Sequence, residues 1–181
     1  MKVIFLDIDG VLNTSETYDK IYRSKGFLGI YDIEIDNFRL EYLKQIIEQT
    51  DAKIVLSSSF RYFFAKENNK IIPTNLKSKK VYDLFNRYGI EIYDTTPTEK
   101  QSREEEIEFW LANRDDIESF IIIDDDPSMF ENLLDKLIQT SRVRLNYLMS
   151  FMKESFGLCE RHIPEIVDRL NKKEKVLSKH F

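Results

Sequence analysis

The chain has little cysteine, no long hydrophobic run near its start and no excess of positive charge. Cys159 is the only cysteine among 181 residues, which excludes a disulfide framework and leads us to expect a reducing, cytoplasmic location. The first apolar run is short and ends in acidic residues, so we expect neither a secretory signal nor a membrane span there. The formal net charge of −5 argues against strong nonspecific binding to nucleic acid.

What is present predicts one globular domain. Hydrophobic residues make up 42% of the chain and charged residues 33%, a balance typical of a soluble protein that buries a full core. No internal repeat is evident. We expect the domain to occupy residues 1–171 and the Lys- and Glu-rich tail, residues 172–181, to fray.

Five short apolar runs predict β-strands. A strand with one solvent-exposed face alternates polar and apolar residues, whereas continuous apolar runs favour parallel strands that are buried on both faces. The five runs are Val3–Leu6, Lys53–Leu56, Ile90–Tyr93, Phe120–Ile123 and Leu137–Gln139.

Apolar residues with helical spacing lie between and after these runs. Strands that alternate with helices predict a doubly wound α/β domain, and such sheets bind ligands at the carboxyl ends of their strands. The predicted inward-facing residues are Phe38, Leu43, Ile46 and Ile47; Val81, Leu84, Phe85 and Tyr88; Ile107, Trp110 and Leu111; Met129, Leu133 and Leu134; Leu145, Leu148, Met149 and Met152; and Ile166, Val167 and Leu170.

Two of the predicted strands run directly into acidic residues. Asp7 and Asp9 follow the first strand, and Asp124, Asp125 and Asp126 follow the fourth. Carboxylates crowded at a strand end repel one another, so one is protonated or a cation lies between them. Such oxygen ligands suit Mg²⁺. Alternatively the clusters cap helices, which fits Asp126 better than the Asp7–Asp9 pair because a cap needs one acceptor.

Residues after the second strand, and a basic residue further on, are candidate anion ligands. Ser57, Ser58 and Arg61 combine hydroxyls and backbone N–H groups at a strand end with a guanidinium that can bind an anion through two hydrogen bonds; the alternative is an ordinary serine-rich turn. Arg103 lies in the first turn of a predicted helix, where a cation opposes the helix dipole. It is therefore favoured over Lys100 as the charge-balancing residue, the alternative being a salt bridge to the glutamates that follow it.

Three segments bear on access to such a site. Residues 13–36 follow the first acidic pair without a regular period and form either a flap over the site or a surface loop. Residues 141–156 are expected to add a helix, which serves the core or a dimer; the oligomeric state stays open. Residues 62–99 have room for one helix and one strand, so we expect no full cap domain.

These parts suit phosphoryl transfer. That reaction needs a nucleophile, a proton donor, phosphate ligands and a cation that offsets charge. A carboxylate can be the nucleophile and form an aspartyl-phosphate. His162 and His180 lie far along the chain and are expected to be structural or solvated.

The first acidic pair belongs to a longer motif. The sequence DIDGVL at residues 7–12 resembles the first motif of the haloacid dehalogenase (HAD) superfamily, D-x-D-G-[TV]-L, in its phosphatase and phosphotransferase branch. The sequences KIVLSSSFR at 53–61, IDDD at 123–126 and LIQT at 137–140 resemble small HAD domains of Swiss Army Knife RNA-repair proteins. Polynucleotide kinase–phosphatases carry a related phosphatase module. The resemblance covers the chain to about residue 170 and implies a three-layer Rossmann-like HAD fold with a minimal cap.

That resemblance assigns roles to the acidic residues. It implies that Asp7 is the nucleophile, and that Asp9 protonates the leaving oxygen and then deprotonates the hydrolytic water. It implies that Mg²⁺ is bound by Asp7, by the backbone carbonyl of Asp9 and by Asp125, with Asp124 beside it; the run of three aspartates leaves that register open by one residue.

The resemblance also implies the phosphate ligands and the activity. Ser57 would bind the transferring phosphoryl group, and Arg103 or Lys100 would offset its charge, although the family's usual residue there is a lysine. The implied function is a Mg²⁺-dependent phosphomonoesterase for a phosphorylated small molecule or a nucleic-acid end. The alternatives are a small-metabolite or nucleotide phosphatase and a non-catalytic HAD-like binding module; no membrane partner is expected.

Overall fold

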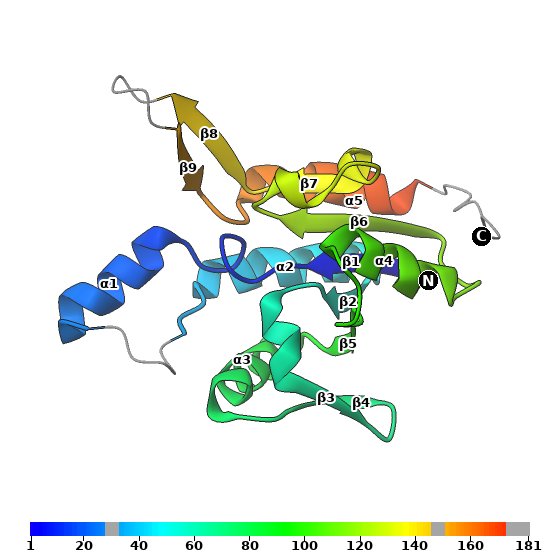
Figure 1. The fold of residues 1–181 in the computed structure, drawn as a ribbon, viewed down its shortest axis with the longest axis horizontal. Helices are drawn as coiled ribbons and strands as arrows, with labels where there is room; N and C mark the ends of the chain where they lie inside the picture. Colours follow the sequence, from blue (N-terminus) through cyan, green and yellow to red (C-terminus); the bar gives the residue numbers. More distant parts are fainter. Residues whose placement is uncertain (28–32, 146–150, 173–181) are drawn as a thin grey trace.

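A five-stranded sheet forms the centre of the protein (Figure 1). The computed structural model describes residues 1–27, 33–145 and 151–172, with side chains outside 142–155. The strands lie in the order β5-β2-β1-β6-β7, and all neighbours are parallel. Their bounds are β1 (Lys2–Leu6), β2 (Lys53–Leu56), β5 (Ile92–Thr95), β6 (Ser119–Asp124) and β7 (Leu137–Gln139).

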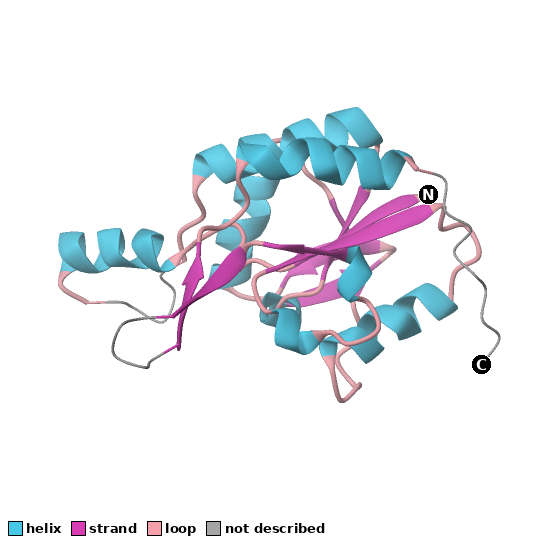
Figure 2. Ribbon diagram, turned by 90° about the horizontal axis from the view of Figure 1, so that it is seen from above, coloured by secondary structure: helices cyan, strands magenta, loops and turns pink. Residues whose placement is uncertain are grey.

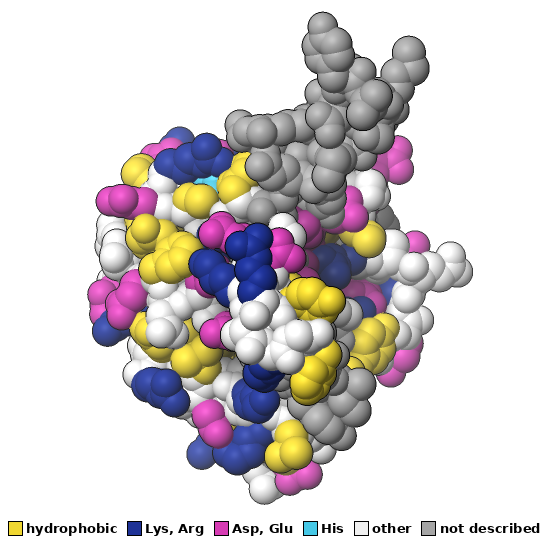
Figure 3. Space-filling model, turned by 90° about the vertical axis from the view of Figure 1, so that its left-hand side faces the viewer, with side chains coloured by type: hydrophobic (Ala, Val, Ile, Leu, Met, Phe, Trp, Pro, Cys, Tyr) yellow, Lys and Arg dark blue, Asp and Glu magenta, His cyan; other side chains and the backbone are white. Residues whose placement is uncertain are grey.

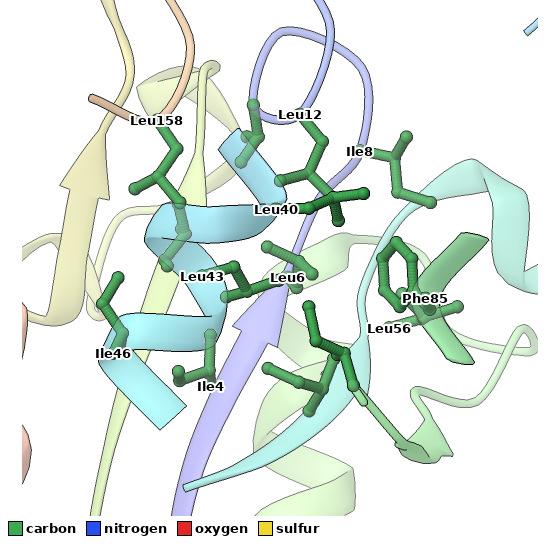
Figure 4. Packing of buried hydrophobic residues seen from close by; sticks show 14 of the residues in the cluster. Ile4, Leu6, Ile8, Leu12, Leu40, Leu43, Ile46, Leu56, Phe85 and Leu158 are labelled. Carbon is green, nitrogen blue, oxygen red and sulfur yellow. The ribbon is translucent and has the colours of Figure 1, made fainter. Parts of the chain in front are cut away.

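Helices cover both faces of this sheet (Figure 2). They are α2 (Asn37–Thr50), α3 (Leu76–Arg87) and α5 (Ile163–Asn171) on one face and α4 (Arg103–Ala112) on the other. Because successive strand residues point to opposite faces, Ile4 and Leu6 pack against the first group (Figure 4). Phe5 packs against α4, where its ring meets the Trp110 ring edge-on at 5.3 Å between centroids. The predicted doubly wound α/β fold is confirmed.

The strand order places a switch point beside β1. The chain runs outward from β1 to β2 and β5, and then returns to build β6 and β7 on the other side of β1. Ligands of doubly wound sheets bind at the carboxyl ends of the strands at such a point. The residues that follow β1 and β6 are therefore the ones that the topology brings to a binding crevice.

Two predicted elements differ from the structure within the sheet domain. β5 begins two residues later than the predicted strand 90–93. The helix predicted around Met129 and Leu133 is wrong: short 3₁₀ turns, η2 (Pro127–Met129) and η3 (Leu134–Lys136), stand there instead. Between them the buried Glu104 carboxylate accepts hydrogen bonds from the backbone N–H groups of residues 131–133 at 2.7–3.1 Å, so these donors are satisfied without a helix.

The helix predicted over residues 141–156 is also wrong. β8 (Ser141–Leu145) and β9 (Phe151–Ser155) pair there as an antiparallel hairpin. Residues 142–145 alternate between polar and apolar, a period of two that suits a strand better than a helix. The part of the predicted helix at 146–150 and the tail at 173–181 lie outside the described residues.

Two elements were not anticipated. A second hairpin, β3 (Phe64–Glu67) and β4 (Lys70–Pro73), follows the 3₁₀ turn η1 (Ser59–Phe63), so residues 62–99 hold more than one helix and one strand. Its turn residues Asn68 and Asn69 both have positive φ, as a two-residue hairpin with a type I′ turn requires. The segment predicted as a flap or loop, 13–36, contains α1 (Ser15–Lys25); α1 and the β8–β9 hairpin extend beyond the same end of the sheet (Figure 1).

Candidate active site

Three neighbouring strands deliver the first site residues to one edge of the sheet. Leu6 is in register with Leu56 of β2 and Ile123 of β6. The hydrogen bonding continues one residue further, since the Asp7 N–H donates to Ile123 O at 3.0 Å and the Ser57 N–H donates to Leu6 O at 2.9 Å. Asp7 and Ser57 therefore follow the ends of β1 and β2, and Asp124 is the last residue of the adjacent strand β6.

Carboxylates gather at this edge. Oxygen atoms of Asp7, Asp124 and Asp125 all lie within 4.8 Å of one another, close enough to share one cation. Gly10 permits this approach: its φ is +78°, and a Cβ placed on it would lie 2.3 Å from Cγ of Asp125. A glycine after the acidic pair is therefore required both by the backbone conformation and by the space that Asp125 occupies.

Arg103 is the basic residue that reaches these carboxylates. Its guanidinium forms an ion pair with Asp124 and lies 3.4 Å from Oδ2 of Asp7. Ser102 caps α4 by accepting a hydrogen bond from the Glu105 N–H, which fixes Arg103 in the first turn. The competing Lys100 instead lies over the ring of Phe109, with Nζ 4.2 Å from the centroid. Geometry thus favours Arg103 for the charge-balancing position.

Burial changes the acidity of the central carboxyls. The pKa of Asp7 is raised to about 7, because burial and the nearby Asp124 carboxylate raise it by more than the Arg103 guanidinium lowers it. Burial likewise raises the pKa of Asp124. Ionised carboxylates at this density need compensation beyond one arginine, and a cation bound between them would supply it.

Asp9 differs from Asp7 in its surroundings. Its side chain is exposed and lies outside the group of oxygens that could share a metal ion. Oδ1 accepts hydrogen bonds from Asn13 Nδ2 at 2.9 Å and from the Tyr18 hydroxyl at 3.0 Å. The two carboxylates of the D-x-D pair both line the cavity but are distinct groups: Asp7 is buried beside an arginine, and Asp9 is exposed.

The residues after β2 divide between the site and the core. Ser59 lines the cavity. Ser58 accepts a hydrogen bond from the Phe60 N–H and caps η1, and its side chain also forms a hydrogen bond with Asp7 that lowers the pKa of that carboxyl. The buried Ser57 hydroxyl has no hydrogen-bond partner in the described part of the chain. Arg61, predicted as an anion clamp, is buried, forms an ion pair with Glu106 and donates to Ser58 O at 2.8 Å. It does not line the cavity, because Glu106 holds it in the interior.

A cavity of about 500 Å³ opens above these residues. Its floor contains Asp7, Arg103 and Asp125, and α1 contributes part of the wall. Residues 13–15 and 18, in the segment predicted as a flap or a surface loop, therefore border this cavity. The full lining is Asp7, Asp9, Gly10, Asn13, Thr14, Ser15, Tyr18, Ser59, Arg103, Asp125, Asp126 and Met129.

Several of these lining residues were missed by sequence reasoning. Asn13 follows the D-x-D-G turn by three residues, and Gly10 N–H donates to its Oδ1 at 3.1 Å, so its closeness in the chain was an available signal. Tyr18 carried no such signal, because its placement depends on α1. Glu106, the partner of Arg61, could not be identified from the sequence either. It lies in a run of three glutamates, and only the geometry of α4 determines which of them are buried.

A family model for the HAD domain in Swiss Army Knife RNA repair proteins matches residues 3–144. The chain belongs to this family. Searches of the curated proteins and of the solved structures returned no match. Membership in the family, the five-stranded parallel sheet and the acidic cluster make this a HAD-type hydrolase fold with a candidate metal site. None of the helices in the described ranges is both long and apolar enough to cross a membrane.

Proposed function

We propose that this HAD protein is a Mg²⁺-dependent phosphomonoesterase that forms a phosphoryl intermediate on Asp7. The observation that carries the proposal is the pairing of Asp7, buried beside Arg103, with an exposed carboxylate, Asp9, two residues away. A nucleophile and a proton carrier in one cavity are the two groups that ester hydrolysis through a covalent intermediate requires.

The donor set fits Mg²⁺. The oxygens of Asp7, Asp124 and Asp125 lie within 4.8 Å of one another, and Mg²⁺ prefers a few carboxylates together with water and substrate oxygens. We propose Asp7 and Asp125 as direct ligands with the backbone carbonyl of Asp9, because Asp125 lines the cavity while Asp124 pairs with Arg103. The ion, when bound, would neutralise charge on the phosphoryl group and the carboxylates.

In the first half of the reaction, an Asp7 oxygen attacks phosphorus while the bond from phosphorus to the ester oxygen breaks. Asp9 gives its proton to that ester oxygen, which leaves as an alcohol. Arg103 stays beside Asp7 and balances the charge of the phosphoryl group. The Ser57 hydroxyl has no other partner in the described residues and is our candidate donor to a phosphoryl oxygen.

In the second half, water replaces the alcohol. Asp9, now ionised, accepts a proton from the water molecule as its oxygen attacks phosphorus. The bond between phosphorus and the Asp7 oxygen breaks, which releases inorganic phosphate and restores the Asp7 carboxylate. Asp9 is again protonated, so one phosphate ester and one water have become an alcohol and phosphate.

For the substrate, we favour a nucleic-acid terminal phosphate over a small metabolite or nucleotide. In the described residues α1 and two short hairpins are added to the sheet rather than a cap domain, and α1 contributes to the lining of the cavity, which leaves room for a polymer end. The family description names RNA repair proteins. Figure 3 shows Lys and Arg side chains on one face in separate groups, with acidic and hydrophobic side chains between them, which suits recognition of an end better than tracking of a long backbone.

The non-catalytic alternative is disfavoured by the acidic cluster. A binding module would gain nothing from three carboxylates held within 4.8 Å, two of which have raised pKa values because they are buried. Carboxylates whose pKa values are shifted by burial next to other charged groups are more often catalytic or metal-binding. We also propose the cytoplasm as the location, from the single cysteine.

Phosphate release from p-nitrophenyl phosphate and from 3′- and 5′-phosphorylated oligonucleotides tests the proposal. We expect release with Mg²⁺, none with EDTA, and a loss of at least about 10³-fold in Asp7→Asn. Asp115→Asn, at an exposed aspartate outside the cavity, is the matched control. Undetectable release from every substrate, together with no Mg²⁺ binding by calorimetry, would overturn the proposal. Preference for one oligonucleotide end over p-nitrophenyl phosphate would support the nucleic-acid substrate.

A further inference from the structure

The D-x-D pair has a hydrogen-bonded support that the proposed reaction does not yet use. Both Asn13 Nδ2 and the Tyr18 hydroxyl reach the same oxygen of Asp9, Oδ1, at 2.9 and 3.0 Å. They also contact each other, with Asn13 Nδ2 3.0 Å from the Tyr18 oxygen. Oδ1 thus accepts two hydrogen bonds, while Oδ2 of Asp9 accepts none from the described residues.

Asn13 is held so that its amide must face Asp9. It is fully buried, and its Oδ1 accepts the Gly10 N–H at 3.1 Å. Because the carbonyl end of the amide is taken by the backbone, the N–H end is the one directed at the carboxylate. The turn that carries Asp9 and the side chain that contacts Asp9 are therefore one unit.

Tyr18 is held from the opposite side by the start of α1. The Thr14 N–H donates to Thr17 Oγ1 at 3.0 Å, and Thr17 Oγ1 donates to Oδ2 of Asp36 at 3.0 Å. Asp36 in turn accepts from Nε of Arg39, on α2, at 2.9 Å. This chain of contacts ties the first turn of α1 to the core, so Tyr18 reaches Asp9 from a fixed position.

We propose that Tyr18 and Asn13 are positioning residues that occupy Oδ1 of Asp9 and so reserve Oδ2, which accepts no hydrogen bond from the described residues, for proton transfer. This inference rests on the proposed phosphomonoesterase function. Two donors on one carboxylate oxygen leave the proton to be carried by the other oxygen, and they hold the carboxyl plane in one orientation.

The state of Tyr18 agrees with a donor role. Burial, and after it the charge and hydrogen bond of Asp9, raises the pKa of the Tyr18 hydroxyl above its usual value. The phenol therefore stays protonated and continues to donate when Asp9 ionises in the second half of the reaction. Through Tyr18, helix α1 thereby helps to orient Asp9, which acts first as the acid and then as the base.

Two substrates that differ mainly in their leaving group separate positioning from a general structural defect. Phenyl phosphate releases a poor leaving group that needs a proton from Asp9, whereas p-nitrophenyl phosphate releases a good one that needs little help. Loss of a hydrogen bond to Oδ1 of Asp9 should therefore slow the hydrolysis of phenyl phosphate more than that of p-nitrophenyl phosphate. A misfolded site would slow both reactions equally.

We expect Tyr18→Phe to lower kcat for phenyl phosphate by about tenfold or more and to widen the ratio between the two substrates by at least about fivefold. Tyr22→Phe is the matched control, since Tyr22 lies one turn further along α1 and is 56% exposed. The affinity for Mg²⁺, measured by calorimetry, should not change. Asn13→Asp, which keeps the acceptor for Gly10 and replaces the donor by a like charge, should give the same change in ratio.

The outcomes distinguish the two proposals. If the wild type hydrolyses both esters and Tyr18→Phe slows them equally or not at all, the positioning role is overturned and the phosphomonoesterase remains. If the wild type hydrolyses neither ester, releases no phosphate from the 3′- or 5′-phosphorylated oligonucleotides and binds no Mg²⁺, the phosphomonoesterase proposal fails and the positioning role fails with it.

Discussion

Replacing Asp7 by asparagine should stabilise the metal-free protein while it removes activity. Asp7 has only 6% of its surface exposed, and burial raises its pKa from 3.8 to about 7 despite the neighbouring Arg103. A carboxyl with a higher pKa in the folded than in the unfolded chain binds more protons when folded, so its ionisation destabilises the fold. Asparagine keeps the size of the side chain and carries no charge, and Arg103 retains Asp124 as a partner.

The size of the effect follows from the two pKa values. This destabilisation is absent below about pH 4, where both states are protonated, grows between about pH 4 and 7, and stays constant above about pH 7. The difference amounts to about 4 kcal/mol near pH 8 and about 2 kcal/mol near pH 5.5. Since 1 kcal/mol shifts the melting temperature of a chain of this size by about 2–4 °C, Asp7→Asn should melt about 8 °C or more above the wild type near pH 8.

Thermal and urea unfolding in EDTA, followed by circular dichroism near pH 5.5 and pH 8, measures this gain. The exposed control Asp115→Asn should unfold with the wild type at both pH values. Saturating Mg²⁺ should stabilise the wild type more than Asp7→Asn and so reduce the difference. A gain of equal size at both pH values, or no gain near pH 8, would refute the assignment of a buried, strained carboxylate at this position.

Two further predictions follow from the same cluster. The affinity for Mg²⁺ should rise with pH up to about 7 and level off above it, because a proton competes for Asp7 below its pKa; calorimetric titration at several pH values checks this, and a constant affinity would contradict it. Arg103→Ala should lower phosphatase activity by about 10²-fold or more, whereas Lys100→Ala should leave it unchanged because Lys100 lies over Phe109; equal losses in both variants would contradict our choice of the basic residue.

The apolar strands and the acidic residues at their ends can be predicted from the sequence because each is a pattern of neighbouring residues. A strand buried on both faces must be apolar throughout, so the runs at β1, β2, β6 and β7 stand out without knowledge of their partners. Alternation with helices then implies a parallel sheet whose carboxyl ends meet. That reasoning placed Asp7, Asp124 and Asp125 together, as they are found.

Errors arose where neighbours rather than local pattern decide the structure. The segment around Met129 has helical spacing of apolar residues, but the carboxylate of Glu104 binds its backbone N–H groups and turns replace the helix. Leucines and methionines with helical spacing predict a helix at 141–156, but residues 142–145 also alternate between polar and apolar, and the segment pairs as a hairpin. A helical and a strand period compete only in the second segment, but in both segments tertiary contacts decide the structure.

By itself, then, the sequence determined the fold class, the order of the sheet-forming runs and the acidic residues at the strand ends, because hydrophobic periodicity and chain connectivity are properties of neighbouring residues. Only the tertiary structure decided which charged side chains face the cavity. Arg61 and Arg103 are equally plausible anion ligands in the sequence, yet Glu106 holds Arg61 in the core while α4 directs Arg103 to Asp7. Tyr18 reaches Asp9 because α1 begins beside it, a contact that depends on the path of the chain in space.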